Sequence, residues 1–161
     1  MERLGLFVFV ALSLMCISTV ECSDMDIGRM IQWVDAKVGW LISARKFQNY
    51  GCYCSKNGPT DGIVPVDQID KCCMRHNQCY DGLVREGVCA GDTFGQSYGY
   101  KKITENGAKT MTCTSDPHTE TCKYELCKCD ATVAHCFADN EPHYNSKHKG
   151  VGKSSCQHAG K

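Results

Sequence analysis

One histidine set between cysteines is the most chemically suggestive feature of this sequence. His76 lies in the run CCMRHNQCY at residues 72–80, and Asp130 follows the run CKC at residues 127–129. A histidine hydrogen-bonded to a carboxylate can act as a general base at neutral pH, because the carboxylate orients the ring and stabilises its protonated form. A buried His–Asp pair can equally be a satisfied core contact. The elements that carry the two residues decide between these readings.

The spacing of the cysteines indicates how these elements pack. Cys72 and Cys79 are seven residues apart, as are Cys129 and Cys136, and seven residues are two turns of helix. In antiparallel helices, 72 pairs with 136 and 79 with 129 in a single register. Parallel helices would pair 72 with 129 and 79 with 136, and the connecting chain is long enough for this arrangement too.

The antiparallel arrangement would bring His76 within about half a helical turn of Asp130 at the seam between the helices. Residues 51–64 are rich in Gly, Asn, Asp, Ser and Pro, which favours a loop with inward-turned carbonyls. Cys73 lies about 100° around the helix from its neighbour in the seam and is free to hold Cys54. Such a bridge would fasten the loop over the His76 end of the seam.

Apolar periodicity predicts the remaining elements. The run SDMD at residues 23–26 resembles a capping box, and apolar residues then recur at helical spacing as far as Ile42. We expect a first helix over this stretch, and a second that opens at Pro65 and Asp67 and ends at Gly82. A hairpin with strands near residues 98–100 and 109–114 should follow. A second long helix begins at Thr121, in a pattern that neither Gly nor Pro interrupts before Asp139-Asn140.

The first 22 residues predict an export signal. Arg3 precedes an apolar run from Leu4 to Met15, which is shorter than the roughly 20 residues that a transmembrane helix needs. Its removal takes away two of the 14 cysteines and leaves an even number for six disulfides. Zinc binding is the rival explanation, but the one-residue gaps in the C-x-C pairs do not match zinc knuckles.

The composition indicates one secreted domain over residues 23–161. The 18 Lys and Arg balance the 18 Asp and Glu, so no affinity for nucleic acid is implied. The C-terminal tail is locally basic, which we interpret as a solvated segment in preference to a patch for anionic lipid. Its cationic residues are Lys147, Lys149, Lys153 and Lys161.

The loop run NYGCYC at residues 49–54, the run CCMRHNQCY, the run CKCD ending at Asp130 and the pair Cys136-Phe137 occur in the order typical of one family. With these motifs the sequence resembles the secreted, calcium-dependent, disulfide-rich phospholipases A2. The resemblance implies a mainly α fold with two long antiparallel disulfide-linked helices, an N-terminal helix, a calcium-type loop and a small β-hairpin. It implies the bridges Cys52–Cys156, Cys54–Cys73, Cys72–Cys136, Cys79–Cys129, Cys89–Cys122 and Cys113–Cys127.

The resemblance also implies roles for the site residues. His76 would be the general base, Asp130 would orient it, and Tyr80 together with Tyr98 or Tyr100 would hydrogen-bond Asp130. Calcium would sit on backbone carbonyls of the loop and on the residue that follows the histidine; the corresponding residues here are Tyr53, Ser55, Asn57 or Gly58, and Asn77. The substrate would be the sn-2 ester of a glycerophospholipid at a membrane surface.

Three features depart from the family pattern. Asn77 stands where the family has an aspartate that binds calcium, Ser55 replaces a glycine, and ten residues instead of seven separate Cys54 from Pro65. An asparagine offers one neutral oxygen where a carboxylate offers two charged ones. Extracellular calcium modules work near roughly 10⁻⁴ to 10⁻³ M, which leaves little reserve, so a weakened calcium site is expected.

Two functions follow from these patterns. One is a secreted, monomeric phospholipase A2-like hydrolase of weak activity at membrane surfaces. The alternative is a non-catalytic homologue that acts by binding membranes or a cell-surface receptor. A generic cysteine-rich binding module is a poorer explanation, since it would not require a His–Asp pair beside a loop.

Overall fold

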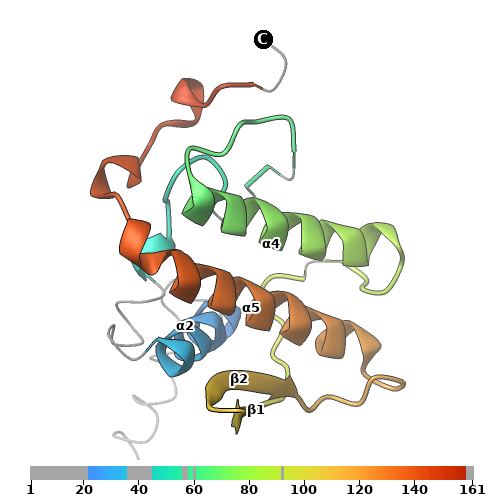
Figure 1. Ribbon diagram of the computed structural model, residues 1–161. Helices are drawn as coiled ribbons and strands as arrows, with labels where there is room; N and C mark the ends of the chain where they lie inside the picture. The colour runs from blue at the N-terminus through green and yellow to red at the C-terminus, as the bar shows by residue number, and fades with distance from the viewer. Residues whose placement is uncertain (1–21, 36–44, 56–57, 60, 92, 159–161) are drawn as a thin grey trace, which may run out of the picture.

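The computed structural model describes residues 22–35, 45–55, 58–59, 61–91 and 93–158 (Figure 1). The predicted export signal at residues 1–22 lies almost wholly outside this part, as do residues 36–44 of the first predicted helix. In chain order the elements are α2 (Cys22–Val34), α4 (Gln68–Arg85), β1 (Tyr100–Glu105), β2 (Ala108–Cys113), α5 (Thr121–Asn140), η2 (Glu141–His143), η3 (Ser146–His148) and η4 (Lys153–Ser155).

The two long helices α4 and α5 lie side by side and run in opposite directions (Figure 1). Two bridges join them, Cys72–Cys136 with a Cα–Cα distance of 5.8 Å and Cys79–Cys129 with one of 5.9 Å. The near-equal distances show that both bridges fit one register between straight helices. The antiparallel prediction is therefore confirmed.

The predicted end of the second helix at Gly82 was wrong. Gly82 lies inside α4, which ends at Arg85, and a Cβ built on Gly82 would meet only the Arg85 guanidinium at 3.8 Å. A glycine costs a helix interior about 1 kcal/mol, which tertiary packing offsets here. The chain leaves the helix at Gly87, whose φ is +72° and whose N–H donates to Val84 at 3.1 Å.

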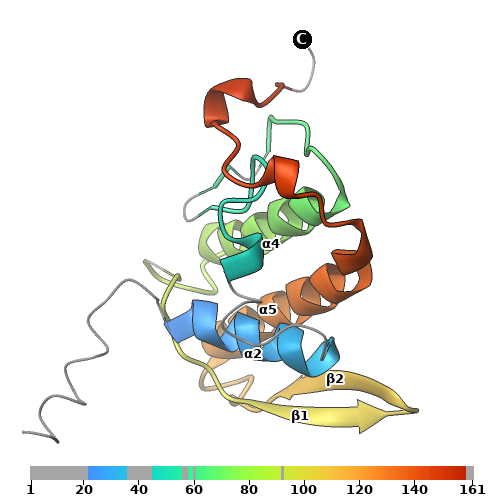
Figure 2. The same ribbon diagram turned by 90° about the vertical axis from the view of Figure 1, so that its left-hand side faces the viewer.

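The hairpin is antiparallel, with Tyr100 paired to Cys113 at its base and Glu105 to Ala108 at its tip. Asn106 and Gly107 connect the strands with φ values of +50° and +81°, as a two-residue primed turn requires. The disulfide Cys113–Cys127 attaches β2 to α5. Helix α2 packs between the hairpin and α5 (Figure 2).

The C-terminal segment packs over the loop that precedes α4 (Figure 2). Cys156 is bonded to Cys52, the Gly150 N–H donates to Asn49 at 2.7 Å, and the Lys149 ammonium donates to three backbone carbonyls at residues 45–48. Part of the basic tail is therefore bound to the domain and not freely solvated.

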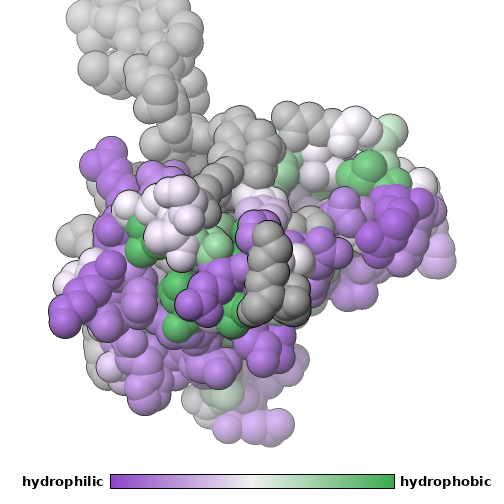
Figure 3. Space-filling view, turned by 90° about the horizontal axis from the view of Figure 1, so that it is seen from above, coloured by the Kyte–Doolittle hydropathy of each residue, from purple (hydrophilic) through white to green (hydrophobic). Residues whose placement is uncertain are grey.

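The face seen in Figure 3 is mostly hydrophilic, with small separate hydrophobic areas. Within the described ranges, the structure has no helix of the length and hydrophobicity that a membrane span requires.

Candidate active site

The helix pair brings His76 of α4 and Asp130 of α5 into direct contact. His76 Nε2 lies 2.6 Å from Asp130 Oδ1; the histidine side chain is 12% exposed and the aspartate side chain 0%. Because a carboxylate only accepts hydrogen bonds, Nε2 carries the hydrogen of this contact. A neutral ring in that tautomer has its free lone pair on Nδ1, so Nδ1 is the atom able to take up a proton.

Two tyrosine hydroxyls complete the shell around the buried carboxylate. Tyr80 donates to Asp130 Oδ1 at 2.8 Å, and Tyr98 donates to Oδ2. Burial, and then the Asp130 charge, raise the pKa of the Tyr98 phenol above its ordinary value, so this hydroxyl stays protonated. Of the two candidate tyrosines, Tyr98, just before β1, is thus the partner of Asp130, while the ring of Tyr100 in β1 lies 6.3 Å from the Tyr98 ring.

Aromatic packing fixes the ring of the histidine. The His76 and Tyr80 ring centroids are 4.5 Å apart, and Phe94 lies 5.1 Å beyond Tyr80. Tyr80 therefore both packs on His76 and hydrogen-bonds the carboxylate that His76 contacts. Such a hydrogen-bonded network around Asp130 holds its members in one arrangement within a low-dielectric interior.

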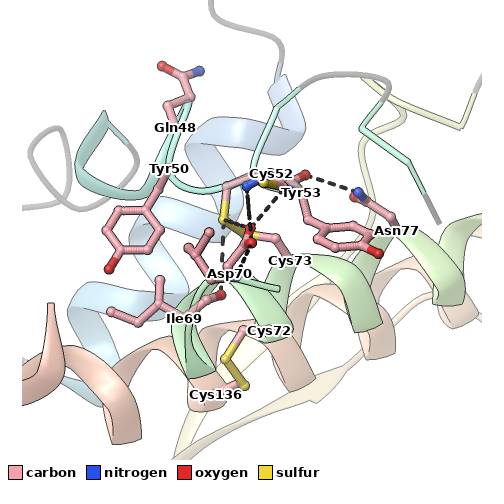
Figure 4. The surroundings of a disulfide bond; sticks show 12 residues. Gln48, Tyr50, Cys52, Tyr53, Ile69, Asp70, Cys72, Cys73, Asn77 and Cys136 are labelled. Atoms are coloured by element: carbon pink, nitrogen blue, oxygen red, sulfur yellow. Dashed lines mark hydrogen bonds between the residues drawn. A yellow bond between two sulfur atoms is a disulfide. The ribbon is translucent and has the colours of Figure 1, made fainter. Parts of the chain in front are cut away.

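A second face of α4 holds the loop. Asp70, Cys73 and Asn77 recur at helical spacing on this face, and all three contact loop residues (Figure 4). The fully buried Asp70 accepts the backbone N–H groups of Tyr53 at 2.8 Å, Cys52 at 3.0 Å and Val66 at 3.0 Å. The carboxylate thereby ties both ends of the loop to α4.

Asp70 is the structural residue that the sequence did not reveal. An acidic residue is common in the first turn of a helix, because its negative charge interacts favourably with the positive end of the helix dipole. The position of Asp70 in the sequence does not distinguish this ordinary role from that of a buried carboxylate that binds the loop. The only sequence signal for this contact was the glycine at position 51. In the structure its φ is +59°, and a Cβ there would lie 2.3 Å from the Asp70 carboxyl carbon. A glycine was needed so that the backbone could approach this carboxylate.

Asn77 contacts the loop as a hydrogen-bond donor. Its Nδ2 lies 3.0 Å from the carbonyl oxygen of Tyr53 (Figure 4). The same nitrogen lies 3.0 Å from the carbonyl oxygen of Pro59. Of the other residues expected to hold calcium, Ser55 directs its carbonyl to the Gly58 N–H at 2.9 Å, and Asn57 lies outside the described residues.

The described groups of the loop do not fit a calcium ion in this arrangement. Calcium needs six to eight oxygen ligands, which commonly include carboxylates. Here the available oxygens are neutral, and Asn77 turns a nitrogen toward two of them. Ser55 Oγ is buried without a hydrogen-bond partner, but this hydroxyl is neutral too. No cluster of three His, Cys, Asp or Glu side chains suited to a metal occurs in the part that the structure describes.

The arrangement can therefore perform proton transfer. It offers an accessible imidazole with a free nitrogen, a buried carboxylate that stabilises the imidazolium, and two tyrosines that hold the carboxylate.

Comparison with known proteins agrees with this geometry. A family profile described as Phospholipase A2 matches residues 25–149. The phospholipase A2 AP-PLA2-II of Acanthaster planci is 36% identical over 147 residues, 86% of this chain and 89% of that protein. The acidic phospholipase A2 BthA-1 of Bothrops jararacussu is 34% identical over 86% of each chain, and a phospholipase A2 of Ovis aries is 34% identical over 68% of this chain and 83% of its own. With its helix pair, hairpin and six disulfides, the chain belongs to the secreted phospholipase A2 family.

Proposed function

We propose that the protein hydrolyses the sn-2 ester of glycerophospholipids at membrane surfaces, with weak activity. The observation that carries the proposal is the buried His76–Asp130 pair with its two tyrosines. The family acts at phospholipid surfaces, and its disulfide-rich members support secretion of this chain. We expect the secreted protein to be a monomer. Residues 1–22 would be the export signal and residues 23–161 the single domain.

The residues support a general-base mechanism. His76 Nδ1 would take a proton from water as the water oxygen attacks the ester carbonyl, and Asp130 would stabilise the imidazolium. When the tetrahedral intermediate collapses, the imidazolium would return the proton to the departing alcohol. Tyr80 and Tyr98 would act only by positioning Asp130.

The weak activity follows from the expected calcium site. The family is calcium-dependent, and a calcium ion held by the loop would supply polarisation of the ester carbonyl and neutralisation of the phosphate. The proposed ligands of this chain are all neutral, and Asn77 replaces the one carboxylate of the family pattern. They are Tyr53, Ser55, Asn57, Gly58 and Asn77. We therefore expect a weakened site and slow turnover.

The alternative function is a non-catalytic homologue that binds membranes or a cell-surface receptor. The specific observation in its favour is that Asn77 donates to two loop carbonyls where a calcium ligand would be needed. The complete surroundings of Asp130 favour the enzyme, because a scaffold without catalysis gains little from a proton-accepting histidine.

The test is phospholipid hydrolysis on mixed vesicles by the oxidised protein, with calcium titrated from zero to tens of millimolar. We expect slow hydrolysis that requires calcium above the roughly 10⁻³ M of extracellular modules. His76→Gln should lower the rate about 10²- to 10⁴-fold, because it removes the base. Hydrolysis at an unreduced rate in His76→Gln would exclude this residue as the base. No hydrolysis at any calcium concentration would favour the binding protein.

A further inference from the structure

The amide of Asn77 lies at the point where the loop carbonyls converge. Its Nδ2 is 3.0 Å from the Tyr53 oxygen and 3.0 Å from the Pro59 oxygen, and both partners can only accept hydrogen bonds. The atom between them must therefore be the nitrogen, since the side-chain oxygen would repel both carbonyls. The two amide hydrogens are used by these two contacts.

The backbone is tightly closed around this amide. A Cβ built on Gly58 would lie 2.4 Å from the Tyr53 oxygen, 2.8 Å from Asn77 Nδ2 and 3.0 Å from the Ser55 oxygen. The Gly58 N–H donates to Ser55 at 2.9 Å, and the Ser55 N–H donates to Tyr53 at 2.8 Å. Gly58 therefore lies so close to the Tyr53 carbonyl, the Ser55 carbonyl and the Asn77 amide that no side chain would fit at position 58.

The same loop has two further attachments to α4. The Asp70 carboxylate accepts the Tyr53 N–H at 2.8 Å, and Cys54 is bonded to Cys73. Figure 4 shows Asp70, Cys73 and Asn77 reaching the loop from successive turns of the helix. Asn77 therefore closes a loop whose beginning is already fixed, and it neutralises the carbonyl dipoles that converge there.

We propose that the Asn77 amide takes the structural place of a cation, so that the loop keeps its closed shape without calcium. The partial positive charge of the two amide hydrogens meets two loop carbonyl oxygens, of which that of Tyr53 is among the expected calcium ligands. A calcium ion would have to displace both hydrogen bonds and would gain one neutral oxygen from Asn77 in return. Calcium near roughly 10⁻³ M, the range of extracellular modules, therefore leaves the loop unchanged. This inference concerns the loop and holds whether or not His76 acts as a base.

The experiment is amide hydrogen exchange of the oxidised protein, read on the peptide that contains Ser55 and Gly58, in EDTA and in 5 mM calcium. Wild-type exchange should be slow and equal in both. Asn77→Asp places a carboxylate against two carbonyl oxygens, so exchange in EDTA should be at least about tenfold faster, as expected for two lost hydrogen bonds. Calcium should restore its protection.

The matched control is Asn106→Asp, which makes the same change of charge at the exposed hairpin turn. Its loop should exchange like the wild type. A wild-type loop that exchanges rapidly in EDTA and gains protection from calcium would overturn the proposal. Should Asn77→Asp fail to fold, the wild-type comparison alone still decides, and calorimetric titration of wild type with calcium gives a second measurement.

The loop proposal and the proposed hydrolysis fail in different ways. Hydrogen exchange does not depend on turnover, so a calcium-independent loop can be found in an inactive protein. Hydrolysis that is lost in His76→Gln can likewise be found in a protein whose loop needs calcium. The two measurements therefore distinguish a wrong assignment of the base from a wrong assignment of the amide.

Discussion

Asp130 is the residue on which the candidate site depends. It is fully buried and accepts hydrogen bonds from His76, Tyr80 and Tyr98. A buried carboxylate is costly unless its oxygens are bonded, and here three donors share the two oxygens. The tyrosines thus stabilise the charge that His76 needs opposite it, without themselves reaching the reacting atoms.

The pair Tyr98 and Tyr100 allows this dependence to be measured. Tyr98→Phe should lower the free energy of unfolding by about 1–2 kcal/mol, because it removes one hydrogen bond from a buried charge. Tyr100→Phe is the matched control: its ring is close to that of Tyr98, and its hydroxyl is not among the donors that the structure shows on Asp130. Chemical denaturation with the disulfides intact gives both values. Equal effects of the two variants would contradict the assignment of Tyr98 as the partner.

The sequence could predict the His76–Asp130 contact but not the choice between Tyr98 and Tyr100. The period of a helix fixes which residues face a neighbouring helix, so cysteine spacing predicts this contact once the helices are taken as antiparallel. The position of Tyr98 depends on where the chain enters β1, and the strand begins only at Tyr100. Likewise, the donor role of Asn77 depends on the path of the loop, which composition does not determine.

At the scale of elements, α4 joins two parts of the molecule through two faces. One face carries the cysteines and histidine that meet α5, and the other carries Asp70, Cys73 and Asn77. The spacing rules that predicted the first face apply equally to the second. Spacing predicted this face only at Cys73 and the resemblance placed Asn77 beside the loop, whereas Asp70 was not predicted because its partners are backbone groups of the loop.

The loop's approach to α4 can be tested with two glycines of positive φ. Gly51 has a φ of +59° and faces Asp70, whereas Gly62 has a φ of +76° and nothing within 4 Å of a built Cβ. Gly62→Ala should cost about 1 kcal/mol of unfolding free energy from backbone strain alone. Gly51→Ala adds a collision with a buried carboxylate and should cost about 3 kcal/mol or more.

Chemical denaturation of Gly51→Ala and Gly62→Ala under the same conditions gives the two losses of unfolding free energy to be compared. The difference between them isolates the close approach, because both share the strain of the left-handed backbone. Similar losses in the two variants would mean that the loop can move away from Asp70 at little cost.

At the scale of the whole molecule, six disulfides hold short elements around a small core. Several buried tyrosines fill this core beside carboxylates. Burial is the largest cause that raises the pKa of Tyr50, Tyr53, Tyr98 and Tyr100 above the ordinary value. Hydrogen bonding to Asp67 adds to the effect at Tyr50, and the Asp130 charge adds to it at Tyr98.

These shifts predict how stability depends on pH. In the unfolded chain all seven tyrosines ionise near pH 10, whereas these four stay protonated to higher pH in the fold. Their contribution to stability is complete below the tyrosine pKa of the unfolded chain and is lost as pH rises through the pKa values of the folded protein. The free energy of unfolding should therefore fall above about pH 10.

Ultraviolet titration of tyrosinate after rapid pH jumps should show fewer than seven tyrosines ionising near pH 10 in the native protein. In guanidinium chloride all seven tyrosines should ionise together near pH 10. If the native protein gave the same titration curve as the denatured protein, the tyrosines around Asp130 would be accessible to solvent and the hydrogen bonds to Asp130 would be open.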